Sequence, residues 1–178
     1  FYQYHPYSTY WGPMHWGHLC TSDFVRWEIL EPALAPDSDF DCEGCFSGTA
    51  IEFEDRHILA YTGVSKNKKG ETLQNQCLAE GDGLCYKKIL QNPVISAANV
   101  PFEFQKGDFR DSKMWREDGK FYMACVLKMP DGKGALVCFR SENLLDWKFV
   151  SVIDKSSGKS GMWECPDIFK LDGKDVVI

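Results

Sequence analysis

A carboxylate with bulky apolar neighbours stands in the stretch MWECPDIF, residues 162–169, where Glu164 lies between Trp163 and Cys165. An ionised carboxylate in such surroundings loses hydration, so it must find a partner or its pKa rises. A carboxyl group that keeps its proton near neutral pH can act as a general acid. Glu164 is therefore a candidate proton donor, and the alternative is a solvated side chain without a chemical role.

A second candidate acid is Asp111, which stands directly after Arg110 in the stretch FRDSKMW. A guanidinium beside a carboxylate stabilises the ionised form. Asp111 and Glu164 can form a working pair only if the fold brings residues 111 and 164 to one place. The elements that could do so must be sought in the rest of the chain.

The chain repeats itself at intervals of roughly 60 residues. Three segments carry a Cys, a short polar turn and an aromatic residue followed by a charged one: LCTSDFVRWEI, QCLAEGDGLCYKKI and VCFRSENLLDWKFV. Their aromatic residues, Trp27, Tyr86 and Trp147, are 59 and 61 positions apart. Such regular spacing indicates one structural unit used several times.

A second repeat runs out of phase with the first, in AIEFEDRHILAYTG, KMWREDGKFYMACV and DIFKLDGKDVVI. Alternating apolar residues around acidic turns are hairpin signals, and helical periodicity is nearly absent. About four short strands per unit are typical of a β-propeller blade. The sequence thus predicts an all-β fold, an incomplete propeller of about three blades.

The phase of this repeat predicts which residues face the propeller axis. Counting eight residues back from the acids of the three turns, Asp55, Asp118 and Asp172, leads to Ser47, Arg110 and Glu164. Equivalent positions on innermost strands can converge on one axial pocket. The alternative is that they are rim residues with no joint role.

Composition excludes several classes of function. The chain has 178 residues, 44% of them hydrophobic and 26% charged, which is typical of one globular domain. A net charge of -6 without a basic cluster argues against nucleic-acid binding, and no apolar run approaches the roughly 20 residues that span a membrane. No signal peptide heads the chain, which begins on FYQYHP without a Met, as if cut from something longer.

The eight cysteines fall mostly in strand-like apolar runs, where a free thiol packs as a small hydrophobe. A disulfide framework is the alternative. Cys42 and Cys45 form a C-x-x-C, but no second pair or His lies at zinc-finger spacing, so we expect no metal site. The sequence also lacks an N-x-S/T sequon, and both features favour a reducing, cytoplasmic location.

Five segments in this order, FYQYHP, WGPMHWGH, CFSGTAI, FRDSKMW and MWECPDIF, resemble glycoside hydrolase family 32 over essentially the whole chain. This is the family of invertases, fructan hydrolases and bacterial sucrose-6-phosphate hydrolases. The resemblance implies a five-bladed propeller followed by a β-sandwich, with residues 1–178 supplying about three blades. It also implies hydrolysis of β-fructofuranosides with retention through a fructosyl-enzyme, a small sugar as substrate, and no cofactor. Two carboxyl groups about 5–5.5 Å apart serve such a reaction.

The resemblance also assigns roles to individual residues. Glu164, in the family's E-C motif, would be the general acid/base, its pKa raised by apolar neighbours. Asp111 would be the transition-state stabiliser, kept ionised by Arg110. Substrate-binding positions fall on Gln3, Trp11, Phe46, Ser47 and Arg110. The rings of Trp16 and Trp163 could add apolar walls, and packing in the core is the alternative for the aromatic residues.

Two departures from the family pattern affect what is expected. The family's nucleophile lies in a W-M-N-D-P-N-G motif before the FYQY segment, and we expect residues 1–178 to lack it, together with the last blades and the sandwich. Ser112 replaces the proline of the family's R-D-P motif, which removes a fixed φ next to Asp111. A non-catalytic sugar-binding propeller and a fructosyltransferase of the same family are therefore kept as alternatives.

Overall fold

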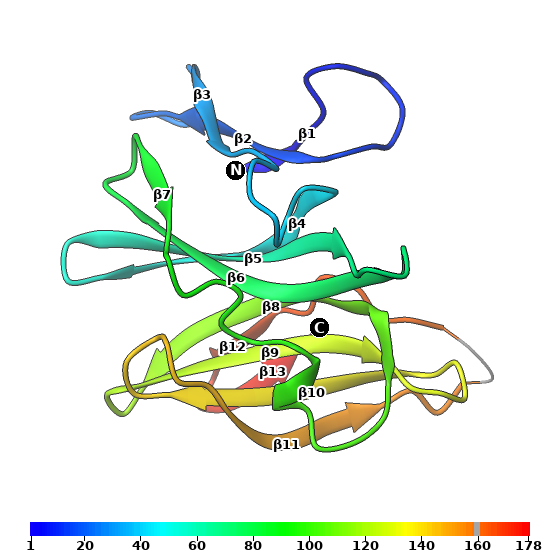
Figure 1. Cartoon of the computed structure of the whole chain (residues 1–178). Coiled ribbons are helices and arrows are strands. Elements are labelled where there is room, and N and C mark those ends of the chain that lie inside the picture. The colour runs from blue at the N-terminus through cyan, green and yellow to red at the C-terminus, as the bar shows by residue number, and fades with distance from the viewer. Residues whose placement is uncertain (159–160) are drawn as a thin grey trace.

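The computed structural model describes residues 1–158 and 161–178, and this part of the chain forms four antiparallel sheets and a short 3-10 turn at Ala97–Asn99 (Figure 1). The all-β prediction is confirmed. The first sheet contains β1 (Tyr2–Tyr4), β2 (His15–Cys20) and β3 (Glu28–Leu34). The second contains β4 (Gly44–Phe53), β5 (Arg56–Lys66), β6 (Thr72–Gly81) and β7 (Tyr86–Lys88).

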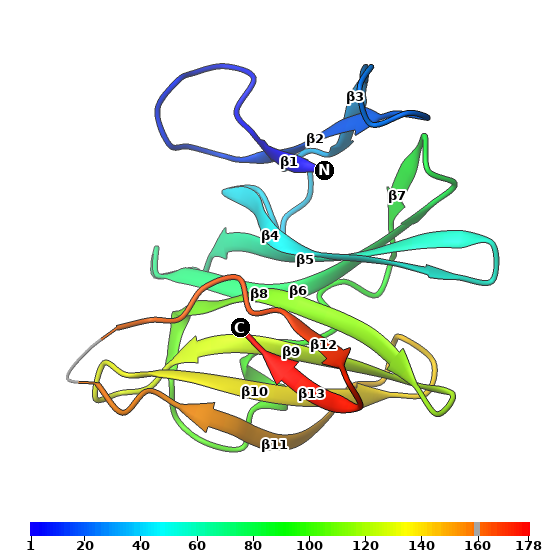
Figure 2. The ribbon, with the colours of Figure 1, turned by 180° about the vertical axis from the view of Figure 1, so that it is seen from behind.

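The third sheet also has four strands in sequence order, β8 (Gln105–Glu117), β9 (Lys120–Lys128), β10 (Gly134–Ser141) and β11 (Lys148–Lys155). The fourth sheet is the hairpin of β12 (Ile168–Leu171) and β13 (Lys174–Val177). Seen from behind, this hairpin lies over the third sheet, beside β9 and β10 (Figure 2). The four-stranded meander is the blade that the repeat predicted, and the described residues form two such sheets together with a three-stranded sheet and a hairpin.

Two-residue turns close the hairpins of the second predicted repeat. They are Glu54–Asp55, Asp118–Gly119 and Asp172–Gly173, in which every residue has a positive φ between 49° and 75°. Turns with positive φ at both central residues match the right-handed twist of antiparallel strands, and Asp and Gly tolerate this conformation best. The acidic turns thus fix which residues pair in the first two strands of each blade.

A different loop closes the hairpins of the first predicted repeat. In each, an Asp or Asn side chain accepts hydrogen bonds from the amides two and three residues ahead of it, at 2.8–3.0 Å. These residues stand four positions before the repeated aromatic residues: Asp23 before Trp27, Asp82 before Tyr86, and Asn143 before Trp147. This side-chain turn replaces hydrogen bonds that the loop backbone cannot make to itself.

The sheets pack face to face, and each interface contains a core. Strand β5 shows the pattern clearly, because Ile58 and Ala60 contact the third sheet while Leu59 and Tyr61 contact the first. Alternate residues of a strand point to opposite faces, so a sheet buried on both sides has a continuous apolar strand such as ILAYTGV. A third core, formed by Ala124, Val126 and Leu136, lies against the Met162–Ile168 region.

Strands β4, β8 and β12 each begin a sheet, as the innermost strands of propeller blades do. The four sheets do not close into a ring. Within residues 1–158 and 161–178, no helix has the length and hydropathy needed to cross a bilayer.

Candidate active site

Three equivalent tripeptides line one cavity of about 230 Å³. They are Ser47–Thr49 on β4, Asp111–Lys113 on β8, and Cys165–Asp167 directly before β12. Each tripeptide begins seven residues before the first residue of its hairpin turn, Glu54, Asp118 or Asp172. Successive blades therefore present the same three positions to a shared cavity.

This geometry corrects the predicted alignment of the blades. Ser47 was predicted to be equivalent to Arg110 and Glu164, but it is equivalent to Asp111 and Cys165. The count was wrong by one residue because the turn of the second sheet begins at Glu54 rather than at Asp55. Arg110 and Glu164 are the residues immediately before the cavity-lining tripeptides.

Asp111 occupies a strained position at a bulge of β8, where the pairing with β9 shifts between Arg110 and Lys113. Its φ is 59°, unusual for a residue other than glycine, and its side chain is buried, with 5% of the residue exposed. The Asp111 amide donates to Thr62 Oγ1 at 3.0 Å, and its Oδ2 accepts from the Cys165 amide at 3.0 Å. The backbone and the carboxylate are thus held by two different blades.

Burial raises the pKa of the Asp111 carboxyl above its ordinary value. The Cys165 amide and the Arg110 guanidinium, whose Nε lies 3.8 Å from Oδ2, lower this pKa by less than burial raises it. Arg110 was expected to keep Asp111 ionised, and its guanidinium does lower the pKa of that carboxyl, but desolvation has the larger effect.

Glu164 contacts the same guanidinium. Its Oε1 accepts from Arg110 Nη2 at 2.9 Å, and Arg110 Nη1 also donates to Asp108 Oδ1 at 2.8 Å. The Glu164 side chain is 65% exposed, so the expected apolar enclosure is not formed and that prediction is wrong. Arg110 does bring the two predicted acids together, since it touches both Asp111 and Glu164.

An adjoining cavity of about 280 Å³ continues from the first along Ser47, Gly48 and Thr49, which line both. Gln3 and Trp16 line this second cavity, where the Gln3 side chain donates to the Cys45 carbonyl at 3.3 Å and the Trp16 indole donates to the Phe46 carbonyl at 3.0 Å. The structure therefore brings Gln3, Ser47 and Asp111 to two cavities that share one wall.

The remaining predicted residues lie at the margins. Trp11 is largely exposed and stands edge-on to Phe46, with ring centroids 5.2 Å apart. Trp163 and Glu164 line a third, larger cavity of about 770 Å³, which shares Pro166 with the first. An aromatic wall is thus present on the Trp163 side as well as on the Trp16 side.

Six residues that were given no role from the sequence also line the first cavity: Gly48, Thr49, Lys113, Cys165, Pro166 and Asp167. Lys113 Nζ lies 2.6 Å from Asp167 Oδ1, so this wall carries a charge pair. The signal that could have identified them was the seven-residue distance to each hairpin turn, had the turn of the second sheet been placed correctly.

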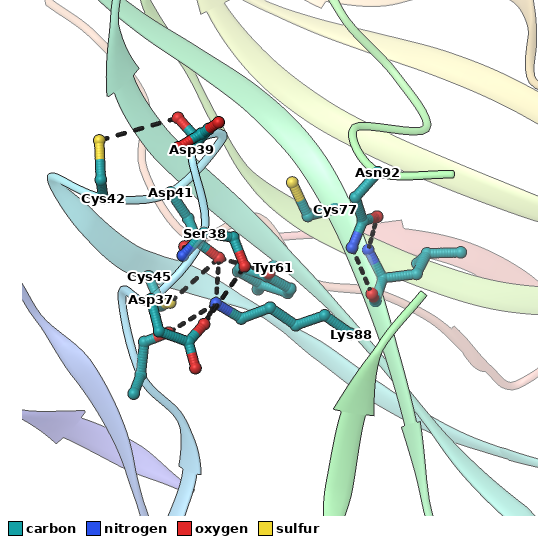
Figure 3. Close-up of polar contacts among 12 residues, drawn as sticks. Asp37, Ser38, Asp39, Asp41, Cys42, Cys45, Tyr61, Cys77, Lys88 and Asn92 are labelled. Carbon is teal, nitrogen blue, oxygen red and sulfur yellow. Dashed lines mark hydrogen bonds and ion pairs between the residues drawn. The ribbon is translucent and has the colours of Figure 1, made fainter. Parts of the chain in front are cut away.

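The C-x-x-C cysteines have separate partners. Cys42 Sγ lies 3.7 Å from the Asp39 carbonyl, whereas Cys45 Sγ lies 3.8 Å from Asp41 Oδ2 (Figure 3). All eight cysteines lie in the described residues and are free thiols. This arrangement fits the expectation that buried cysteines pack as small hydrophobes.

Comparison with known families gives one match over residues 1–178, to the model described as Glycosyl hydrolases family 32 N-terminal domain. The chain is 40% identical over 192 residues to the sucrose-6-phosphate hydrolase of Zymomonas mobilis, covering 100% of this chain and 36% of that protein. It is 40% identical over 185 residues to the Bacillus subtilis sucrose-6-phosphate hydrolase, covering 100% of this chain and 37% of that protein. The chain thus spans a little over a third of these relatives.

Among solved structures, a mutant of a Bombyx mori GH32 β-fructofuranosidase in complex with sucrose is similar over 99% of this chain and 37% of that one. The TM-score is 0.85 and the sequences are 38% identical. The fold similarity therefore extends over the three tripeptides and both adjoining cavities.

Proposed function

Because the chain belongs to glycosyl hydrolase family 32, we propose that the full-length protein is a β-fructofuranosidase that hydrolyses sucrose or sucrose 6-phosphate. The observation that carries this proposal is Arg110, whose guanidinium contacts both Asp111 and Glu164 beside a cavity lined by three blades. Relatives named for sucrose 6-phosphate and a solved relative with bound sucrose support the substrate class.

In the proposed reaction, Glu164 donates its proton to the glycosidic oxygen as the bond to the fructosyl anomeric carbon breaks. A carboxylate attacks that carbon and forms a fructosyl ester. Water then attacks the same carbon, gives a proton to Glu164 and releases the carboxylate, so the fructose keeps its original configuration. The family's attacking carboxylate belongs to a W-M-N-D-P-N-G motif, which does not occur in residues 1–178. We therefore expect the nucleophile elsewhere in the full-length protein.

Asp111 takes the role of stabilising the positive charge that develops on the fructosyl ring. A carboxylate held in a buried, preorganised position interacts strongly with such a charge, because little water screens it. Gln3 and Ser47 are proposed to bind sugar hydroxyls, with Trp16 beside them and the Trp11–Phe46 pair at the margin. The prediction of a cytoplasmic location is also kept, on the free thiols and the lack of sequons.

The test is to mix purified full-length protein with sucrose and, separately, with sucrose 6-phosphate, and to measure released fructose. We expect release from at least one substrate, and the ratio of the two kcat/KM values gives the preference. No fructose from either would refute the proposal. Fructosyl oligosaccharides that grow with sucrose concentration would instead indicate a transferase.

A sugar-binding propeller without activity is the second candidate, favoured by Ser112 in place of the family's proline. Calorimetric titration with sucrose separates the two. Binding without release of fructose would support the second candidate, whereas turnover excludes it.

A further inference from the structure

We propose that Thr62 is a positioning residue for the reaction, because its buried hydroxyl joins the strands that present Ser47 and Asp111 to the cavity. The inference rests on the proposed function for its kinetic consequence and on the geometry alone for the anchoring. Thr62 lies on β5, lines neither adjoining cavity, and acts on the substrate only through Asp111.

Strand β8 lies at a free edge of its sheet. As the first strand of its sheet, β8 pairs with β9 on one side, and its other backbone groups need partners elsewhere. Side chains of the second sheet supply them. Phe109 N donates to Gln74 Oε1 at 3.0 Å, Gln76 Nε2 donates to the Phe109 carbonyl at 2.9 Å, and Asp111 N donates to Thr62 Oγ1 at 3.0 Å.

Thr62 is fully buried. A hydroxyl donates one hydrogen bond and accepts others. Thr62 Oγ1 accepts from the Asp111 amide and has two acceptors within reach of its proton, Gln76 Oε1 at 3.1 Å and the Ser47 carbonyl at 3.3 Å. Gln76 stands directly opposite Thr62 in the pairing of β5 with β6. The hydroxyl is therefore a shared contact of β4, β6 and β8.

These hydrogen bonds hold Asp111 in an unusual backbone conformation. A non-glycine residue at a φ of 59° costs on the order of 1 kcal/mol or more, so the surroundings must fix it. The family's proline is replaced by Ser112, which leaves Asp111 without that restraint. Hydrogen bonds supply it here: Thr62 holds the Asp111 amide, and Thr49 Oγ1 donates to the Ser112 carbonyl at 2.6 Å.

The test compares three variants of the full-length protein. Thr62→Val keeps the shape and removes the hydroxyl, Thr62→Ser keeps the hydroxyl, and Ser65→Ala is the control on the same strand. Ser65 is also buried, and within residues 1–158 and 161–178 its hydroxyl bonds none of residues 109–112. If Thr62→Val does not fold, Thr62→Ala takes its place.

With sucrose as the probe, Thr62→Val should lower kcat and kcat/KM together by about ten- to a hundredfold, because a small displacement of Asp111 weakens an interaction made in the transition state. Thr62→Ser should stay within about threefold of the unmodified protein, and so should Ser65→Ala. In an Asp111→Asn background, Thr62→Val should cost less than about twofold, since residues that act through one another are not additive. An equal loss in both backgrounds would overturn the proposal.

Hydrogen–deuterium exchange separates this inference from the proposed function. Exchange of the peptide containing Asp111 should be faster in Thr62→Val and slow again in Thr62→Ser, while a peptide from β10 is unchanged. The unmodified protein could release no fructose while the Asp111 peptide still exchanges faster in Thr62→Val. In that case the proposed function fails, but the conclusion that Thr62 holds the Asp111 backbone is retained. Unchanged exchange at Asp111 in Thr62→Val overturns the anchoring itself.

Discussion

At the scale of single residues, Arg110 gives the two acids different surroundings. Asp111 is buried and receives an amide hydrogen bond from another blade, whereas Glu164 is largely exposed at the rim. Carboxyl groups in unlike environments can take different roles in one reaction, one as an acid and one as an ionised group. The guanidinium between them limits how far apart the two side chains can lie.

Replacing Glu164 tests the acid. Glu164→Gln removes the proton that the leaving oxygen requires, so kcat/KM for sucrose should fall by about 10²- to 10⁴-fold. Glu142→Gln, which changes an exposed glutamate in another loop, is the control and should leave kcat/KM unchanged. A fall in Glu164→Gln no larger than the fall in Glu142→Gln would assign the acid to another group.

Replacing Arg110 tests the ionisation of Asp111. The guanidinium lowers the pKa of Asp111, so Arg110→Gln should raise it further. Asp111 must be ionised to stabilise positive charge, and activity falls as the pH drops below its pKa. The acid limb of kcat/KM should therefore move to higher pH in Arg110→Gln.

The control for Arg110→Gln is Lys128→Gln. Lys128 Nζ lies 3.7 Å from Asp108 Oδ2, and Arg110 also binds Asp108. Lys128→Gln therefore removes a nearby cation but keeps the contact between Arg110 and Asp111. Its acid limb should stay in place. A limb that moves equally in both variants would mean that general surface charge, and not the Arg110 contact, sets the pKa.

The sequence predicted the residues of the motifs but not the groups that hold them. Asp111, Ser47 and Gln3 were identified by resemblance, and the structure brings them to adjoining cavities. Thr62 and Gln76 lie inside strands at positions that no motif marks, and their roles depend on which sheet packs against them. The surroundings of Glu164 were predicted wrongly because apolar neighbours in sequence need not enclose a side chain in space.

At the scale of elements, the loop before each repeated aromatic residue is stabilised by one Asp or Asn side chain. Asn143→Ala removes the acceptor for the amides of Leu145 and Asp146 and should lower the free energy of unfolding by about 1 kcal/mol. The measurement is thermal unfolding of the full-length protein. Asn143→Asp keeps the acceptor, as at Asp23 and Asp82, but it loses the hydrogen bond that Asn143 Nδ2 donates to Asp146 Oδ2 at 2.7 Å and should recover only part of the loss.

Glu142→Ala is the matched control for this loop, because it removes a neighbouring exposed side chain without touching the turn. It should change the unfolding free energy by less than about 0.5 kcal/mol. If Asn143→Ala behaves like Glu142→Ala, the side-chain turn contributes nothing and the loop is held by Trp147 alone.

The hairpins were the most predictable elements, because the turn residues in both repeats determine the local backbone conformation themselves. A turn such as Asp118–Gly119 adopts its conformation from its own residues, so the sequence suffices to identify it. The bulges at Ser47 and Asp111 could not be read in the same way, since an extra residue in one strand depends on the pairing with its neighbour.

At the scale of the whole molecule, a buried ion pair fastens the connection between the first two sheets. Lys88, on β7, extends its amine to Asp37 and Asp41 in the segment that leads from β3 to β4 (Figure 3). Lys88 Nζ lies 2.6 Å from Asp41 Oδ2, which is fully buried and also accepts from the Tyr61 hydroxyl at 2.8 Å. The last strand of the second blade thus holds the chain that enters that blade.

Neither the pair nor its burial was visible in the sequence. The residues are 47 positions apart, and Lys88 stands in a YKK run that reads as an exposed strand end. The propeller was predictable because it repeats, whereas this contact occurs once and depends on how two sheets stack.

Breaking the pair of Lys88 and Asp41 should therefore lower the free energy of unfolding by more than Asn143→Ala does. Lys88→Met leaves the buried Asp41 carboxylate without its cation and should lower the free energy of unfolding by about 3–5 kcal/mol, measured by denaturation of the full-length protein. Adding Asp41→Asn should recover a substantial part, because the uncompensated charge is removed. Lys66→Met, which breaks an exposed pair with Glu43, is the control and should cost less than about 1 kcal/mol.

The pair also predicts how stability depends on alkaline pH. Burial lowers the pKa of Lys88, but the Asp37 and Asp41 carboxylates raise it by more, so its folded pKa lies above the ordinary value. A raised lysine pKa contributes stability that is complete below the unfolded pKa and is lost as the pH rises through the folded one. The unmodified protein should lose this contribution at alkaline pH, and Lys88→Met should lack the loss. Parallel curves for the two proteins would show that Lys88 does not hold its proton through the Asp41 contact.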